Sequence, residues 1–94
     1  MQHITLAHQA QPNDDVLFQE VAGEAVLLNL ASERYFGLDP VGTRIWSLLN
    51  RNPLLQQAHH ELCETYDASP EQLQQDLLRL VTELAEAGLV TVSE

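Results

Sequence analysis

The apolar and polar positions divide the 94-residue chain into an extended first half and a helical second half. Two apolar runs, residues 16–21 and 24–30, are separated by Ala22-Gly23, and a third run, residues 34–38, follows a polar turn at 31–33. A two-residue turn that ends in glycine favours a tight hairpin, because glycine adopts positive φ without a steric penalty. The pattern therefore predicts an antiparallel three-stranded meander.

The central run of this meander is apolar at successive positions and not only at alternate ones. It reads Ala25-Val26-Leu27-Leu28-Asn29-Leu30. A strand that buries one face alternates between apolar and polar residues, whereas continuous apolar character is typical of a strand covered on both faces. We therefore expect helices, or an incoming partner, to cover both faces at least in part.

Three helices are predicted after the meander. The first begins at Asp39-Pro40, a capping residue followed by proline, the second at Pro53, and the third at Ser69, with Gly88 as its stop signal. The apolar residues that recur at helical spacing are Val41, Ile45, Leu48 and Leu49 in the first helix, Leu55, Ala58, Leu62 and Tyr66 in the second, and Leu73, Leu77, Leu80, Val81 and Leu84 in the third.

The two ends of the chain give weaker signals. Residues 1–14 are polar and irregular, with at most a short strand at Ile4–Leu6, and this segment could be flexible. Leu89–Val92 reads as a short final strand. The fold class expected for residues 1–94 is a single α+β, winged-helix-like domain: a three-stranded meander, three helices and a short C-terminal strand.

The charge balance excludes several classes of partner. Fourteen acidic residues stand against four arginines and no lysine, which gives a net charge of −10. Proteins that bind nucleic acids or anionic membranes use Lys and Arg to neutralise phosphates. A winged-helix transcription factor would need a basic third helix, but here that helix carries four acids, Glu71, Asp76, Glu83 and Glu86, against Arg79. The acidic surface favours a neutral or basic peptide as partner, unless it serves solubility alone.

Composition also bears on the compartment and on chemistry. No apolar run approaches the ~20 residues of a membrane span, and the first residues lack the pattern of a signal peptide, so we expect a cytoplasmic protein. His59 and Cys63 could share a helix face, but zinc requires about four ligands. We expect no metal, cofactor or catalytic residue, and we expect Cys63 and Trp46 to be packing residues.

The segment from Val26 to Leu49, VLLNLASERYFGLDPVGTRIWSLL, resembles proteins of the PqqD-like family, which recognise ribosomally made peptides. The resemblance includes the aromatic strand Tyr35-Phe36-Gly37-Leu38, then Gly42 and the pair Ile45-Trp46 in the following helix. With the leucine-rich last helix and the ending AEAGLV, it covers about residues 16–92.

This resemblance implies a function. Members of the family bind the leader of a precursor peptide without catalysing a reaction, and YFGLDPVG looks most like the discrete leader-binding proteins of lasso-peptide pathways. The implied partners are the leader, a cysteine protease that cleaves it and an asparagine-synthetase-like enzyme that closes the ring. Two alternatives stay open: a partner of a radical-type enzyme, as in quinone-cofactor pathways, and a structural module of a larger modifying enzyme.

The resemblance also implies a binding site, in which the leader lies as an added strand against residues 34–38, beside the third helix. The open edge of a meander is a template for strand addition, and residues 34–38 contain no proline or lysine to block it. The same edge could pair with a second copy in a weak homodimer. Tyr35 and Phe36 must point to opposite faces, and Asp76, Arg79 and Glu83 could rim the groove. The residues expected to bind the peptide are Leu28, Leu30, Arg34, Tyr35, Phe36, Gly37, Leu38, Leu73, Asp76, Leu77, Leu80, Val81 and Leu84.

Overall fold

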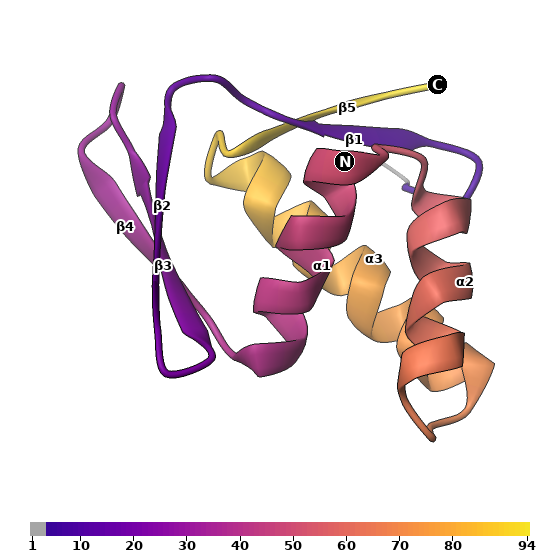
Figure 1. Ribbon diagram of the computed structural model, residues 1–94. Helices are drawn as coiled ribbons and strands as arrows, with labels where there is room; N and C mark the ends of the chain where they lie inside the picture. Colours follow the sequence, from indigo (N-terminus) through magenta and orange to yellow (C-terminus); the bar gives the residue numbers. More distant parts are fainter. Residues whose placement is uncertain (1–3) are drawn as a thin grey trace.

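The computed structural model describes residues 4–94 and has the expected α+β class (Figure 1). The meander, the three helices and the C-terminal strand follow one another in the predicted order, which is confirmed. The elements are β1 (Gln9–Pro12), β2 (Val16–Val21), β3 (Glu24–Asn29), β4 (Arg34–Leu38), α1 (Pro40–Arg51), α2 (Leu55–Thr65), α3 (Pro70–Glu86) and β5 (Val90–Ser93).

The meander is an antiparallel sheet in the order β2-β3-β4. Ala22 and Gly23, with φ of 57° and 84°, form the tight turn between β2 and β3, and two successive positive φ angles match the twist of a hairpin. The turn into β4 is shaped by Asn29, whose side-chain oxygen accepts hydrogen bonds from the backbone N–H groups of Ala31 and Ser32 at 3.0 and 3.4 Å.

All three helices lie on one side of this sheet (Figure 1). Ala25, Leu27 and Asn29 of β3 are buried beneath them, whereas Val26 and Leu28 point to the opposite side. We call that opposite side the outer face. No helix within residues 4–94 covers it, so the helices account for one face of the central strand, and cover of the other face by an incoming partner stays a prediction.

The helices begin and end where their capping residues indicate. Asp39 accepts a hydrogen bond from the Gly42 N–H at 2.7 Å at the start of α1, and Ser69 accepts one from Gln72 at 3.1 Å at the start of α3. Gly88, with φ of 74°, follows the end of α3. The start of α2 differs from the prediction, since the helix begins at Leu55 and not at Pro53.

Strand β1 was not predicted. It pairs antiparallel with β5, with Gln9 opposite Ser93, and buries Ala10 completely. The Ala10 N–H donates to the carbonyl of Pro53 at 2.9 Å, which explains why Pro53 stays outside α2. Residues 4–6 form no strand, so the prediction of a strand at Ile4–Leu6 is wrong.

The flexibility of residues 1–14 stays a prediction, and residues 1–3 lie outside the described residues. None of the helices within residues 4–94 is long and apolar enough to cross a membrane.

Candidate functional site

A groove of about 380 Å³ runs between β4, the start of α1 and the middle of α3. We call it the β4–α3 groove. Its lining is mixed: β4, α1 and α3 contribute apolar side chains, and α3 also contributes three charged ones. The lining residues are Phe36, Gly37, Leu38, Asp39, Val41, Gly42, Ile45, Asp76, Arg79, Leu80 and Glu83.

One side of the groove is an open strand edge. β4 pairs with β3 alone, so its other edge keeps backbone N–H and C=O groups free of ladder hydrogen bonds among residues 4–94. Phe36 is half-buried and points to the helix side, whereas Tyr35 is 74% exposed on the outer face. The structure thus decides which of the two neighbouring aromatic residues faces the groove.

Helix α1 forms a wall of the groove that the sequence reading missed. Gly42 is buried there, and a Cβ at this position would lie 3.2 Å from both Asp39 Oδ1 and Leu38 Cδ2. This small residue lets the capping carboxylate and the end of β4 approach the helix closely. The signal was present in the sequence as a glycine three residues after a helix cap.

The charged rim belongs to α3. Asp76 Oδ1 accepts hydrogen bonds from Gln72 Nε2 at 3.0 Å and from Arg79 at 3.3 Å. In the Asp76–Arg79 ion pair Arg79 is largely exposed and Asp76 is half-buried, and pairs near the surface contribute only about 0–1 kcal/mol to stability. These side chains are therefore available to a ligand at little cost to the fold.

The structure brings together some of the predicted site residues and separates others from them. Phe36, Gly37, Leu38, Asp76 and Leu80 line the groove. The remaining α3 candidates are buried in the core and do not reach it: Leu73, Leu77, Val81 and Leu84. The other candidates lie elsewhere on β3, β4 and their turn, with Leu28 and Tyr35 on the outer face and Leu30 and Arg34 exposed near the turn.

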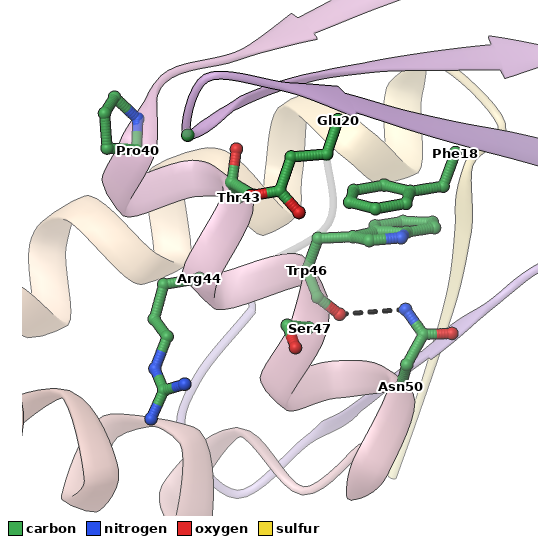
Figure 2. Close-up of a pocket in the computed structure, with 9 residues that line it drawn as sticks. Phe18, Glu20, Pro40, Thr43, Arg44, Trp46, Ser47 and Asn50 are labelled. Carbon is green, nitrogen blue, oxygen red and sulfur yellow. Dashed lines mark hydrogen bonds between the residues drawn. The ribbon is translucent and has the colours of Figure 1, made fainter.

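A second cavity, of about 490 Å³, lies between β2 and α1 (Figure 2). We call it the β2–α1 cavity. Figure 2 shows the Phe18 ring directed at the indole of Trp46, while the guanidinium of Arg44 points away from this aromatic pair. The Asn50 amide donates to the Trp46 carbonyl at 2.9 Å, and the buried hydroxyl of Thr43 has no hydrogen-bond partner among the described residues. Trp46 is buried, as expected of a packing residue.

The two cavities flank α1. Val41, Gly42 and Ile45 face the β4–α3 groove, and Thr43 and Ser47 face the β2–α1 cavity. Successive residues of a helix are about 100° apart, which places these two sets on opposite sides of the helix. A molecule in one cavity therefore leaves the other open.

The described residues form cavities that can bind a ligand, but they show little of the arrangement of side chains that catalysis or metal binding needs. In residues 4–94 no group of three or more His, Cys, Asp or Glu side chains is placed to hold a metal ion. Cys63 Sγ lies 3.6 Å from His59 Nε2, but that nitrogen is also 2.8 Å from the Pro70 carbonyl oxygen. A carbonyl oxygen can only accept, so Nε2 carries a proton and is not free to activate the thiol as a base.

Comparisons with known proteins agree with this geometry. The sequence profile of the family described as "Coenzyme PQQ synthesis protein D (PqqD)" matches residues 24–90. The structure of TbiB1 in complex with the TbiA(beta) leader peptide is 34% identical, covers 85% of this chain and 93% of its own, and has a TM-score of 0.80. The lasso peptide synthetase B1 complexed with the leader peptide shares the fold, with 20% identity, coverage of 88% and 98%, and a TM-score of 0.78. No curated protein matches the sequence significantly.

Proposed function

Because this chain belongs to the PqqD family, we propose that it is a non-catalytic adaptor that binds the leader of a ribosomally made precursor peptide and delivers it to the processing enzymes of lasso-peptide biosynthesis. The observation that carries the proposal is the open edge of β4 beside a groove that combines apolar side chains with charged ones. An extended peptide can pair with such an edge and place alternate side chains in the groove.

Backbone pairing alone does not suffice for binding. Ordering roughly eight leader residues costs on the order of 1–2 kcal/mol each in backbone entropy. About four or five ladder hydrogen bonds return only about 0.5–1.5 kcal/mol each. Burial of an apolar side chain contributes ~1.5–3 kcal/mol, so two or three leader side chains must enter the groove.

The groove residues have separate roles in this proposal. The backbone of Arg34–Leu38 pairs with the leader, and Phe36 and Leu80 contact its inward side chains from opposite walls. Asp76, Arg79 and Glu83 contact leader side chains at the rim, where they tune affinity by about 0–1 kcal/mol per pair. With a net charge of −10, the protein favours a leader that carries Lys or Arg.

The proposal also names the enzymes that receive the bound leader. A leader-cleaving cysteine protease and a ring-forming enzyme are those expected of a lasso pathway, in the cytoplasm. The family's description as a coenzyme PQQ synthesis protein supports a second candidate, a peptide-binding partner of a radical-type enzyme. A structural role inside a larger modifying enzyme, and a weak homodimer through the β4 edge, stay predictions.

The test is a titration of the isotopically labelled protein with the leader half of the precursor peptide encoded beside its gene. We expect saturable binding at micromolar concentration or below, with amide shifts concentrated in β4 and in the part of α3 that lines the groove. A peptide of the same composition in scrambled order is the matched control. Absence of binding to every neighbouring precursor would leave the fold intact and would exclude the adaptor role.

A further inference from the structure

The β2-β3-β4 sheet has a second open edge. β2 pairs with β3 alone, so its other edge also keeps backbone N–H and C=O groups free of ladder hydrogen bonds among residues 4–94. The sequence of β2 contains no proline or lysine that would block pairing. The match to the family profile begins at residue 24 and does not include this strand. β2 is therefore a second template for an added strand, separate from the β4 edge.

The β2–α1 cavity lies on the helix side of this edge. In the strand register Phe18 is opposite Leu27 and Glu20 is opposite Ala25. Leu27 and Ala25 are buried beneath the helices, and directly opposite residues share a face of the sheet. Phe18 and Glu20 therefore point to the helix side, where Figure 2 shows the Glu20 carboxylate directed towards α1. At about 490 Å³ the cavity falls within the range of roughly 300–1,000 Å³ that is typical of ligand pockets.

The polar groups around this cavity mostly accept hydrogen bonds. The exposed Glu20 carries a carboxylate and forms no ion pair within residues 4–94. The amide nitrogen of Asn50 bonds to the Trp46 carbonyl, which leaves its side-chain oxygen as an acceptor, and Ser47 adds a hydroxyl. Arg44 also lines the cavity, but its guanidinium points away from the aromatic pair (Figure 2). The lining therefore favours a positively charged ligand that is rich in donors.

Thr43 points independently to a ligand. It is 8% exposed, and its buried hydroxyl has no hydrogen-bond partner among the described residues. Buried polar groups are almost always hydrogen-bonded, because an unpaired one destabilises the folded protein. Nε of Arg44 is likewise buried without a partner in residues 4–94. Both atoms belong to residues that line the β2–α1 cavity, so a molecule bound there can supply their partners.

An arginine side chain fits these groups better than other cations do. Its guanidinium is planar and can stack on the Phe18 ring, which is 43% exposed and directed at the indole of Trp46. Its five N–H donors can bond the Glu20 carboxylate and the neighbouring acceptors together. Lysine offers a compact charge with three donors and no plane that stacks. The net charge of −10 favours a cationic ligand as well.

We propose that the β2 edge and the β2–α1 cavity form a second peptide-binding site, for an extended segment that pairs with β2 and inserts an arginine side chain between Phe18, Glu20 and Thr43. Strand pairing supplies the backbone contacts, and the cavity selects the side chain. A second copy of this chain is a poor occupant, since it brings another net charge of −10. The inference goes beyond the proposed function, because α1 separates this cavity from the β4–α3 groove.

The experiment uses the full chain and a blocked probe peptide with the sequence Thr-Val-Arg-Val-Thr, whose residues favour strands. The matched control peptide carries citrulline in place of arginine, which keeps the shape of the side chain and removes its charge. Binding is followed by the fluorescence of Trp46, the single tryptophan, and by backbone amide NMR shifts. We expect the arginine peptide to bind with a Kd below about 1 mM and the citrulline peptide at least about fivefold more weakly. Shifts should concentrate in β2 and α1, and shifts confined to β4 and α3 overturn the inference.

Three variants test the side chains of the site. Glu20→Gln should weaken binding of the arginine peptide by at least about fivefold. Glu24→Gln is the matched control, since Glu24 is an exposed glutamate at the start of β3 that does not line the cavity, and the change in net charge is the same. Thr43→Val should weaken binding by about threefold without lowering the melting temperature of the free protein, because the hydroxyl has no partner to lose. Equal effects of the two glutamate variants overturn the inference, since net charge alone would then explain the attraction.

Competition experiments separate this site from the β4–α3 groove. A saturating concentration of leader should leave the affinity for the arginine peptide within about twofold. Displacement of the probe by the leader would place it in the groove and overturn the inference. Self-association in sedimentation that the arginine peptide reverses would assign the β2 edge to a second copy and overturn the proposed occupant. A protein that binds the arginine peptide but no leader would keep this site and lose the proposed function.

Discussion

The side-chain amide of Asn29 donates a hydrogen bond to the carbonyl oxygen of Ala87 at 2.9 Å, and it thereby joins the end of β3 to the end of α3. Its side-chain oxygen accepts from the Ala31 N–H at 3.0 Å in the turn that leads into β4. Since β4 and α3 are walls of the β4–α3 groove, this one buried side chain sets the position of both.

Replacing Asn29 by alanine should therefore lower the free energy of unfolding by about 1–3 kcal/mol, because the carbonyl of Ala87 and the turn amides lose their partner. Urea denaturation measures this loss. Asn50→Ala is the control, since the exposed Asn50 amide bonds only within α1 and its loss should cost less than about 1 kcal/mol. Equal losses in the two variants would contradict the role given to Asn29.

Leader affinity should depend on one of two neighbouring leucines of α3. Leu78 and Leu80 are both half-buried, but only Leu80 lines the β4–α3 groove. Leu80→Ala should weaken leader binding by roughly 5- to 30-fold through lost apolar contact. Leu78→Ala should leave it within about twofold, as measured by anisotropy titration. The reverse order would place the leader elsewhere.

The single tryptophan reports on the β2–α1 cavity. Phe18 is 43% exposed, and its ring is directed at the buried indole of Trp46 (Figure 2). Phe18→Ala should shift the tryptophan emission to longer wavelength and increase its quenching by acrylamide, because water then reaches the indole. Leu17→Ala, one residue away on the outer face, should leave the spectrum unchanged. Identical spectra for both variants would show that Phe18 does not shield Trp46.

The pairing of β1 with β5 should contribute to global stability. Ala10 is fully buried in β1, whereas Gln11 beside it is exposed. Ala10→Asp would place a carboxylate in the core and should cost about 2–4 kcal/mol. Gln11→Asp should cost less than about 1 kcal/mol. Urea denaturation of both variants checks this, and equal midpoints would mean that β1 is not docked in solution.

Cys63 should be dispensable. Cys63 is half-buried, and Nε2 of the neighbouring His59 is hydrogen-bonded to the carbonyl oxygen of Pro70. Cys63→Ser should change the free energy of unfolding by less than about 1 kcal/mol and leave leader affinity unaltered. Zinc should not raise the melting temperature of either form, as any metal that binds the folded state would. A rise seen only with Cys63 present would show a metal site.

Features set by a few neighbouring residues could be predicted from the sequence. The tight turn at Ala22-Gly23 and the helix starts at Asp39 and Ser69 are local signals, because the responsible atoms lie within about four residues of one another. β1 has no such local signal, because it is stabilised by pairing with β5, which is about eighty residues away in the sequence. Its residues, Gln9–Pro12, offer little apolar pattern of their own.

The candidate site could likewise be predicted only in part from the sequence. The edge strand β4 and its neighbour α3 follow from the order of elements and the family resemblance. Which leucine of α3 reaches the groove does not, because that depends on where α1 packs, and Leu77 and Leu80 are indistinguishable by spacing alone. The α1 wall around Gly42 was missed for the same reason.

The pairing of Gln9 with Ser93 has a consequence for the order of events when the protein is made. A ribosome releases β1 before the three helices, but its strand partner β5 emerges after α3 has been synthesised. Contacts between such distant segments form late, since a long loop must close before they stabilise the chain. α3, which forms another wall of the groove, also emerges after β4 and α1. Leader capture is therefore a property of the finished chain and not of the nascent one.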